Sequence, residues 1–229
     1  MRPRAIVEFV VCLTGLLMAL PVAAQTSATV SFSVPATYTA TVPCADCPGI
    51  HESLTFLPGG LYIDRLVYEG RPSTFQSLGR WQRKSDLSQI EIHSGSSPAD
   101  TYAIVDRNHI RKLAPEGSIS PAIYLPTFTR AATAALPSSS FSLSGEYNSK
   151  PGESSLTECR SGFALPVSPT GDAPALDHAY QAANLKPDSP LLVSVTGTIA
   201  LRPGNKSALL IVTHFEHSWP GNSCASPVE

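Results

Sequence analysis

The sequence predicts an all-β protein built from two β domains. Three observations support this fold class: short runs of β-branched and aromatic residues recur, polar or Gly/Pro turns separate them, and helical periodicity is confined to one segment. The 21 prolines and 15 glycines in 229 residues fit many short strands joined by turns. The length allows one large or two small domains with their own cores.

The first half reads as a meander of strands. Apolar residues alternate or cluster in residues 28–34 and 54–67, and Leu57-Pro58-Gly59-Gly60 within the second run predicts a hairpin. Further strands are predicted at residues 75–83, 88–93, 102–106 and 109–113. Sequential strands of this kind curl into a small barrel, which we place in residues 25–115.

The second half predicts a different arrangement. Residues 114–140 are rich in Pro, Ser, Ala and Thr, which predicts a linker at residues 116–140 before a second domain at residues 141–229. Strands are predicted at residues 141–147, 155–158, 163–167, 191–201 and 207–214. Three strands, a helix and two strands follow the order of an OB-fold barrel.

The one predicted helix covers residues 173–183 and lies between the third and fourth of these strands. Asp172 can cap its first amide groups, and Leu176 and Tyr180 belong to its apolar face. Pro187 follows and ends it.

The N-terminus has the features of a secretory signal peptide. Two arginines precede an apolar run at residues 10–20, and Val22 and Ala24 occupy the minus-three and minus-one positions of a cleavage site. We expect residues 1–24 to be removed and the mature chain, which shows no transmembrane segment, to be periplasmic or secreted. Cys12 follows Phe9-Val10-Val11 rather than a small residue, so no lipid anchor is expected.

Charge and motifs exclude several classes of function. The formal net charge of -2 becomes about -3 once the signal is removed, which suggests neither a nucleic acid nor an anionic membrane as partner. The sequence shows no serine-nucleophile elbow, phosphate-binding glycine loop or HExxH pair. The chain is therefore predicted not to be an enzyme.

Four cysteines remain in the mature chain, namely Cys44, Cys47, Cys159 and Cys224. An even set in an exported protein favours two disulfides. Three pairings are possible, and local closure favours Cys44 with Cys47 and Cys159 with Cys224. A bridge across about 65 residues would remove several kcal/mol of unfolded-state entropy.

The Cys44 and Cys47 pair supports three kinds of chemistry. Its thiolates, together with His51, could bind Cu(I), so the sequence suggests copper as a cofactor. Alternatively, a short disulfide stiffens the loop, or the pair exchanges with other thiols. A thioredoxin-type catalyst needs its first cysteine at a helix N-terminus, and the strand pattern after Pro48-Gly49 argues against such a helix.

Two further groups of residues are candidate sites. His214 and His217, with Glu216, could bind Cu(II) or Zn(II), but residues three apart on a strand point to opposite faces, so a solvated strand end is favoured. Aromatic residues could line a barrel mouth for an apolar ligand, although small barrels mostly fill themselves with such side chains. These aromatic residues are Tyr62, Tyr68, Phe75, Trp81 and Tyr102.

Two groups of segments resemble a known family. The first comprises Thr41-Val42-Pro43-Cys44-Ala45-Asp46-Cys47-Pro48-Gly49-Ile50, Leu54-Thr55-Phe56-Leu57 and Gly60-Leu61-Tyr62. The second comprises Glu158-Cys159-Arg160-Ser161-Gly162, Leu165-Pro166-Val167, Leu176-Asp177-His178-Ala179-Tyr180 and Pro190-Leu191-Leu192-Val193. They resemble the N-terminal and C-terminal regions of the copper-resistance lipoprotein NlpE family, and together they cover most of the mature chain.

The resemblance implies a lipocalin-like N-terminal barrel, an OB-like C-terminal barrel with one helix, and roles in copper tolerance and in signalling envelope stress or surface contact. It implies no enzymatic activity. Two features depart from the family pattern: the lipidated N-terminal cysteine is missing, and His51 stands where an acidic residue is usual. The first departure argues against outer-membrane anchoring.

We therefore predict a non-catalytic envelope protein that acts in copper homeostasis or envelope stress sensing through its Cys44 and Cys47 loop, with another envelope protein as partner. Two alternatives remain open, namely a redox-active thiol/disulfide binding module and a carrier of a small apolar ligand. Metal uptake that is lost in Cys44→Ser would favour copper, whereas a copurifying apolar compound would favour the carrier.

Overall fold

A computed structural model describes residues 31–95, 97–115, 121, 124–136, 138–186, 188–204 and 207–225. The predicted signal peptide, Cys12 and Pro187 lie outside the described residues. No helix within the described ranges is both long and apolar enough to cross a membrane.

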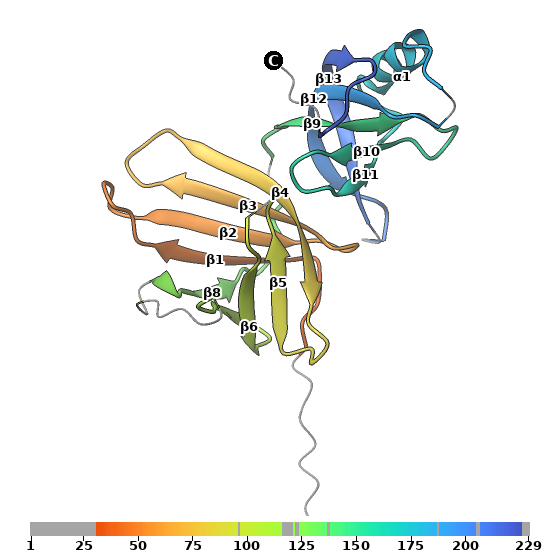
Figure 1. Cartoon of the computed structure of the whole chain (residues 1–229). Coiled ribbons are helices and arrows are strands. Elements are labelled where there is room, and N and C mark those ends of the chain that lie inside the picture. Colours follow the sequence, from red (N-terminus) through yellow and green to blue (C-terminus); the bar gives the residue numbers. More distant parts are fainter. Residues whose placement is uncertain are drawn as a thin grey trace, which may run out of the picture.

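Eight antiparallel strands form a closed barrel in the first half of the chain (Figure 1). Each strand pairs with the next, and the last pairs with the first, so the connectivity is up-and-down. The strands are β1 (Ala36–Val42), β2 (Ile50–Phe56), β3 (Leu61–Tyr68), β4 (Thr74–Arg83), β5 (Gln89–His93), β6 (Asp100–Asp106), β7 (His109–Lys112) and β8 (Thr127–Arg130).

The predicted hairpin around Leu57-Pro58-Gly59-Gly60 is the turn between β2 and β3. Gly59 and Gly60 adopt positive φ angles of 87° and 90°, a conformation that costs glycine least. The amide of Leu57 donates to the carbonyl of Leu61 at 2.8 Å, which closes the turn. The chain therefore reverses here because Gly59 and Gly60 can adopt these φ angles, which is a local property of the sequence.

Two strands of the barrel were not predicted where they occur. Residues 31–34, the described part of the predicted strand at 28–34, are not strand, and β1 begins at Ala36. Strand β8 lies inside residues 116–140, for which the sequence predicts a linker, and it closes the barrel by pairing with β1 and β7. Its one apolar side chain, Phe128, is fully buried, which explains how so polar a segment forms part of the barrel.

The second half forms a five-stranded sheet with one helix, consistent with an OB domain. The strands β9 (Phe141–Asn148), β10 (Ser155–Glu158), β11 (Ala164–Pro166), β12 (Leu191–Leu201) and β13 (Ala208–Trp219) lie in the order β11-β10-β9-β12-β13. Within the described residues, a single parallel bridge between Val167 and Leu210 links the two edges of the sheet. The predicted all-β fold class is confirmed.

Helix α1 (Ala173–Ala182) lies where the sequence predicts a helix, and Asp172 is its N-cap residue, but the Asp172 side chain makes no capping hydrogen bond. The carboxylate of Asp172 instead accepts a hydrogen bond from the amide of Phe215 in β13, at 2.7 Å. The helix buries Leu176, and Ala179 and Tyr180 pack against the same core. Asp172 therefore joins the helix to the sheet, and this long-range bond replaces the local one.

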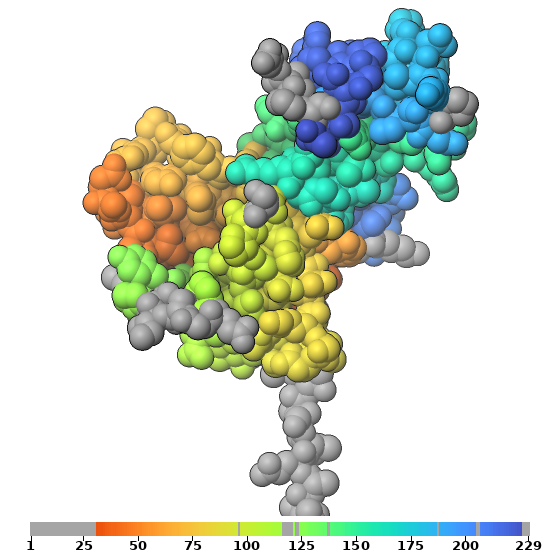
Figure 2. Space-filling view, viewed as in Figure 1, coloured from red at the N-terminus to blue at the C-terminus, as the bar shows by residue number. Residues whose placement is uncertain are grey.

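The barrel and the sheet pack directly on each other. Because side chains alternate along β3, Tyr62 points into the barrel while Leu61 and Ile63 point outward. These outward residues, with Leu57 and Leu78, belong to the hydrophobic core of the second sheet. Each fully buried side chain of this size contributes about 2 kcal/mol. Figure 2 shows the second unit resting on the barrel.

Candidate functional site

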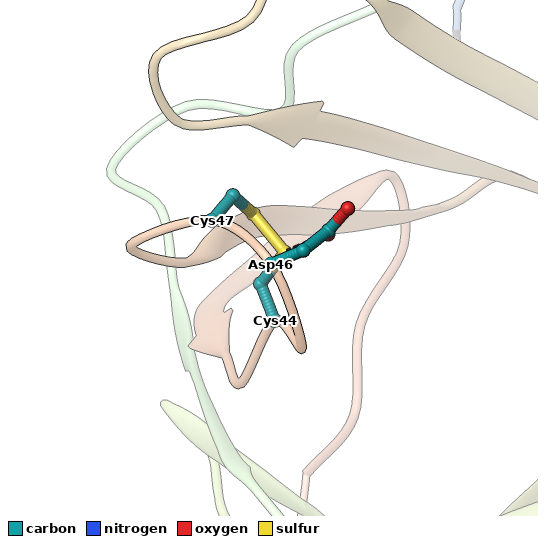
Figure 3. A group of neighbouring side chains, drawn as sticks. All are labelled: Cys44, Asp46 and Cys47. Atoms are coloured by element: carbon teal, nitrogen blue, oxygen red, sulfur yellow. Dashed lines mark hydrogen bonds between the residues drawn. A yellow bond between two sulfur atoms is a disulfide. The ribbon is translucent and has the colours of Figure 1, made fainter.

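The cysteine pair predicted as a functional site lies in the loop between β1 and β2. Cys44 and Cys47 are joined by a disulfide, with 2.01 Å between the sulfurs and 5.3 Å between the Cα atoms (Figure 3). Both side chains are partly exposed. In this state the sulfurs are not thiolates, so they are not available as metal ligands.

Asp46 lies beside the disulfide and is held by Arg71. The carboxylate is 3.5 Å from the sulfur of Cys44, and because a bonded sulfur carries no hydrogen, this is a contact and not a hydrogen bond. The Arg71 guanidinium lies 2.7 Å from the Asp46 carboxylate and donates to its backbone carbonyl at 3.0 Å. The hydrogen bond and the charge of Arg71 lower the pKa of Asp46.

His51 is engaged away from the sulfurs. Its Nδ1 lies 3.0 Å from the hydroxyl of Thr41, and its Nε2 lies 3.0 Å from the carboxylate of Glu69. Within the part of the chain that the structure describes, the group whose ligand atoms lie within 4.8 Å of one another is Cys44, Asp46 and Cys47. The structure thus brings the two cysteines together and puts Asp46, not His51, beside them.

The turn between β3 and β4 braces this loop. Glu69 pairs with His51, its amide donates to the carbonyl of Gly49 at 3.0 Å, and Arg71 holds Asp46. Gly49 is required by close approach: an added Cβ would lie 2.9 Å from Cγ2 of Thr41 and 3.1 Å from the Glu69 carboxylate. The cysteine loop is therefore held in a defined position by a second loop.

The second disulfide joins Cys159, just after β10, to Cys224 in the C-terminal tail. The amide of Cys159 donates to the carbonyl of Ser144 at 2.9 Å, and the amide of Cys224 donates to the Glu146 carboxylate at 3.0 Å. The two acceptors, Ser144 and Glu146, both lie on β9. The disulfide therefore ties the C-terminal tail to the second sheet, and it joins two cysteines 65 residues apart in the sequence.

The sequence matches the NlpE N-terminal domain over residues 38–121 and the NlpE C-terminal OB domain over residues 137–225. The chain belongs to the NlpE family. It is 26% identical to lipoprotein NlpE of Escherichia coli strain K12 over 200 residues, which cover 84% of this chain and 82% of the relative. The family resemblance stated from the sequence is confirmed.

Two solved structures are also similar to this chain. One is the Cpx pathway activator NlpE from Escherichia coli, with 26% identity, 85% of this chain and 100% of that chain covered, and a TM-score of 0.38. The other is a putative lipoprotein from Shewanella oneidensis, with 25% identity, 44% of this chain and 93% of that chain covered, and a TM-score of 0.35.

The histidine group considered near the C-terminus is not assembled. His214 lies 3.9 Å from the carboxylate of Asp172, and His217 contacts the ring of Trp219. Glu216 accepts a hydrogen bond from Thr196 at 2.5 Å. These three side chains thus have separate partners.

The five aromatic residues of the barrel divide between its core and its mouth. Tyr62 and Tyr102 are fully buried in the barrel core, and Trp81 packs against that core. Tyr68 and Phe75 form an edge-to-face pair, and Phe75 is 57% exposed. Most of this set therefore fills the barrel, and one pair remains near the surface.

Sequence reasoning missed a group of charged residues on the inward face of the barrel. Burial, followed by the charge of Asp64, raises the pKa of Glu52 to about 7. Burial raises the pKa of Asp64 to about 6, and Asp100 acts in the same direction. Lys112 pairs with Asp100 at 2.9 Å. The available signal was the alternation Ile50-x-Glu52-x-Leu54-x-Phe56, which puts Glu52 on the inward face.

Proposed function

We propose that this protein is a non-catalytic envelope protein that responds to thiol redox state or to copper through the Cys44 and Cys47 loop. The observation that carries the proposal is a partly exposed disulfide in a loop that a neighbouring turn holds in place. Family membership supports an envelope role, since the Escherichia coli relative is a lipoprotein and is known as a Cpx pathway activator.

The redox step is a thiol–disulfide exchange with a dithiol protein as reductant. One thiolate of the reductant attacks a sulfur of the Cys44–Cys47 bond, which breaks as a mixed disulfide forms. The second thiol of the reductant then releases that mixed disulfide. The reductant is oxidised to its own disulfide, and Cys44 and Cys47 receive two electrons and two protons.

Asp46 makes the two reduced cysteines unequal. A negative charge on the sulfur of Cys44 would face a carboxylate 3.5 Å away, which disfavours the thiolate there. Arg71 partly neutralises that carboxylate. We therefore expect Cys47 to be the better thiolate of the reduced pair.

The copper arm of the proposal applies to the reduced loop. Two thiolates are the soft ligands that Cu(I) prefers, and both come from one short, fixed turn. Asp46 is a hard ligand and is engaged by Arg71, and a role for His51 would require it to leave Glu69. Copper would thus be bound as cargo by Cys44 and Cys47, with His51 as a third ligand only after rearrangement.

The test is Cu(I) binding to reduced protein, measured by competition with a chromogenic Cu(I) chelator. The wild type and the Cys159→Ser/Cys224→Ser variant should bind one Cu(I), and Cys44→Ser/Cys47→Ser should bind none. The Cys159→Ser/Cys224→Ser variant is the matched control, since it also removes one disulfide. Equal binding by all three proteins would reject the copper hypothesis. The redox hypothesis is then tested by counting the free thiols at each cysteine by alkylation and mass spectrometry.

A further inference from the structure

The barrel is closed at one end and open at the other. Within the described residues, β8 pairs with β1 only at Tyr38 and Thr39, and β5 pairs with β4 only over Arg80–Arg83. The other halves of β1 and β4 extend beyond the closed ring, together with β2 and β3 (Figure 1). The inward face of these four strands is therefore an open trough.

A pocket of about 350 Å³ lies on this trough. Its walls are Asp64, Leu66 and Tyr68 of β3 and Phe75, Gln76 and Ser77 of β4, and Arg160 of the second unit completes it. The edge-to-face contact between Tyr68 and Phe75, with ring centres 5.6 Å apart, forms an apolar surface, and Phe75 is 57% exposed. A pocket of this size suits a small organic ligand.

The turn that carries Arg160 has an ordered backbone beside this pocket. The Glu158 carboxylate accepts hydrogen bonds from the amides of Arg160 and Ser161, at 3.0 and 2.6 Å. The stem of Arg160 crosses Gly95 of the barrel, where an added Cβ would lie 3.1 Å from its Cγ. The guanidinium forms no hydrogen bond or ion pair with any residue that the structure describes.

Asp64 supplies the opposite charge and also lacks a full set of partners. Its Oδ1 is shielded from solvent and accepts no hydrogen bond from the described residues. A shielded carboxylate oxygen without a donor costs free energy, which a ligand with a donor would recover. The pocket thus combines a carboxyl group whose Oδ1 lacks a donor, a solvent-exposed guanidinium and an aromatic surface.

A metal ion does not fit this acidic end of the barrel. Glu52, Asp64 and Asp100 influence one another, yet they do not form a group whose ligand atoms lie within 4.8 Å, whereas Cys44, Asp46 and Cys47 do. Carboxylates spread in this way suit an organic cation, which is larger than a metal ion. An uncharged apolar ligand would leave both charges unpaired.

We propose that the pocket binds a zwitterionic amphiphile, with its ammonium group at Asp64, its anionic group at Arg160 and its apolar chain on Leu66, Tyr68 and Phe75. This site is separate from the Cys44 and Cys47 loop, so it stands whether or not the loop binds copper.

Calorimetric titration of the full mature chain with single-chain detergents tests the proposal. The probes share a dodecyl chain and are used below their critical micelle concentrations: dodecylphosphoethanolamine, dodecylammonium, dodecyl sulfate and dodecyl maltoside. Dodecylphosphoethanolamine should bind most tightly. Asp64→Asn should weaken dodecylphosphoethanolamine and dodecylammonium about tenfold, and Arg160→Gln should weaken dodecylphosphoethanolamine and dodecyl sulfate about tenfold.

Matched controls separate this effect from unfolding and from general charge. Asp86→Asn and Arg202→Gln change the same charges on exposed turns away from the pocket, and they should leave all four affinities unchanged. Far-ultraviolet circular dichroism checks that each variant is folded. Tightest binding of another head group, unchanged affinity in both pocket variants, or no binding of any probe would each overturn the proposal.

Discussion

At the scale of single residues, Glu52 is a carboxyl group whose ionisation opposes folding. Its pKa is raised from 4.5 to about 7, so the folded state holds the proton more tightly than the unfolded state. The contribution of protonated Glu52 to the stability of the folded state is fully present below about pH 4.5, and it is lost as the pH rises through 7. Removing this charge should therefore help the protein most at high pH.

Glu52→Gln should raise the stability at pH 8 by on the order of 2 kcal/mol relative to the wild type, and have little effect at pH 4. Thermal unfolding followed by circular dichroism at both pH values measures this. Glu153→Gln, at an exposed turn position, is the control and should change neither value. The assignment would be contradicted if the stability of the wild type rose between pH 5 and 8 and this rise were lost in Glu52→Gln.

Asp46 is the residue that should set the reactivity of reduced Cys44. Asp46→Asn removes the carboxylate 3.5 Å from its sulfur, so the pKa of the Cys44 thiol should fall by up to about one unit, with solvent screening limiting the effect. The pH dependence of alkylation at each cysteine, read by mass spectrometry, gives both pKa values. Asp86→Asn is the control, and a fall at Cys47 alone would argue against this role.

At the scale of elements, Gly49 allows the cysteine loop to approach the β3–β4 turn. Gly49→Ala should destabilise the protein by about 1–3 kcal/mol, because the new methyl group meets Cγ2 of Thr41 at 2.9 Å. Thr41→Ser removes that carbon and keeps the hydroxyl beside His51. The double variant should recover part of the loss in denaturant unfolding, and an absence of recovery would place the clash elsewhere.

Strand β8 closes the barrel through one buried side chain. Phe128→Ala should destabilise the protein by about 3–5 kcal/mol, since Phe128 is fully buried and packs edge-to-face against Tyr102. Phe75→Ala is a matched control, because Phe75 is mostly exposed and its loss should cost little. Equal effects of the two substitutions in urea unfolding would show that β8 does not hold the barrel closed.

Strands with regular alternation could be predicted from the sequence, and those that depend on distant partners could not. Strand β5 alternates polar and apolar residues, and β4, β6 and β7 contain β-branched or aromatic residues, so the positions of these strands were visible locally. Strand β8 has one apolar residue and forms because β1 and β7 offer it partners. Asp172 fits a local cap, yet the amide of Phe215 from β13 takes its carboxylate.

The candidate site, too, could be predicted from the sequence only where it depends on local residues. The spacing of Cys44 and Cys47 identifies the loop, but the sequence shows neither that Glu69 and Thr41 occupy His51 nor that Arg71 reaches Asp46. Those contacts depend on the register of three neighbouring strands. The charged end of the barrel was missed for the same reason, since its carboxylates lie far apart in the sequence.

At the scale of the whole molecule, the two disulfides should differ in what they do for stability. The Cys159–Cys224 bridge closes 65 residues and should contribute about 4 kcal/mol, against about 2 kcal/mol for the Cys44–Cys47 bridge. Cys159→Ala/Cys224→Ala should therefore lower the unfolding midpoint in guanidinium more than Cys44→Ala/Cys47→Ala does. The reverse order would mean that the short bridge organises the fold.

The central claim is that the Cys44 and Cys47 loop reacts while the fold stays intact. The most direct measurement is mass spectrometry of protein taken from cells under oxidising, reducing and copper-loaded conditions, alkylated before and after reduction. We predict that Cys44 and Cys47 gain free thiols in the reducing condition while Cys159 and Cys224 remain bridged. All four cysteines locked in every condition would contradict the claim.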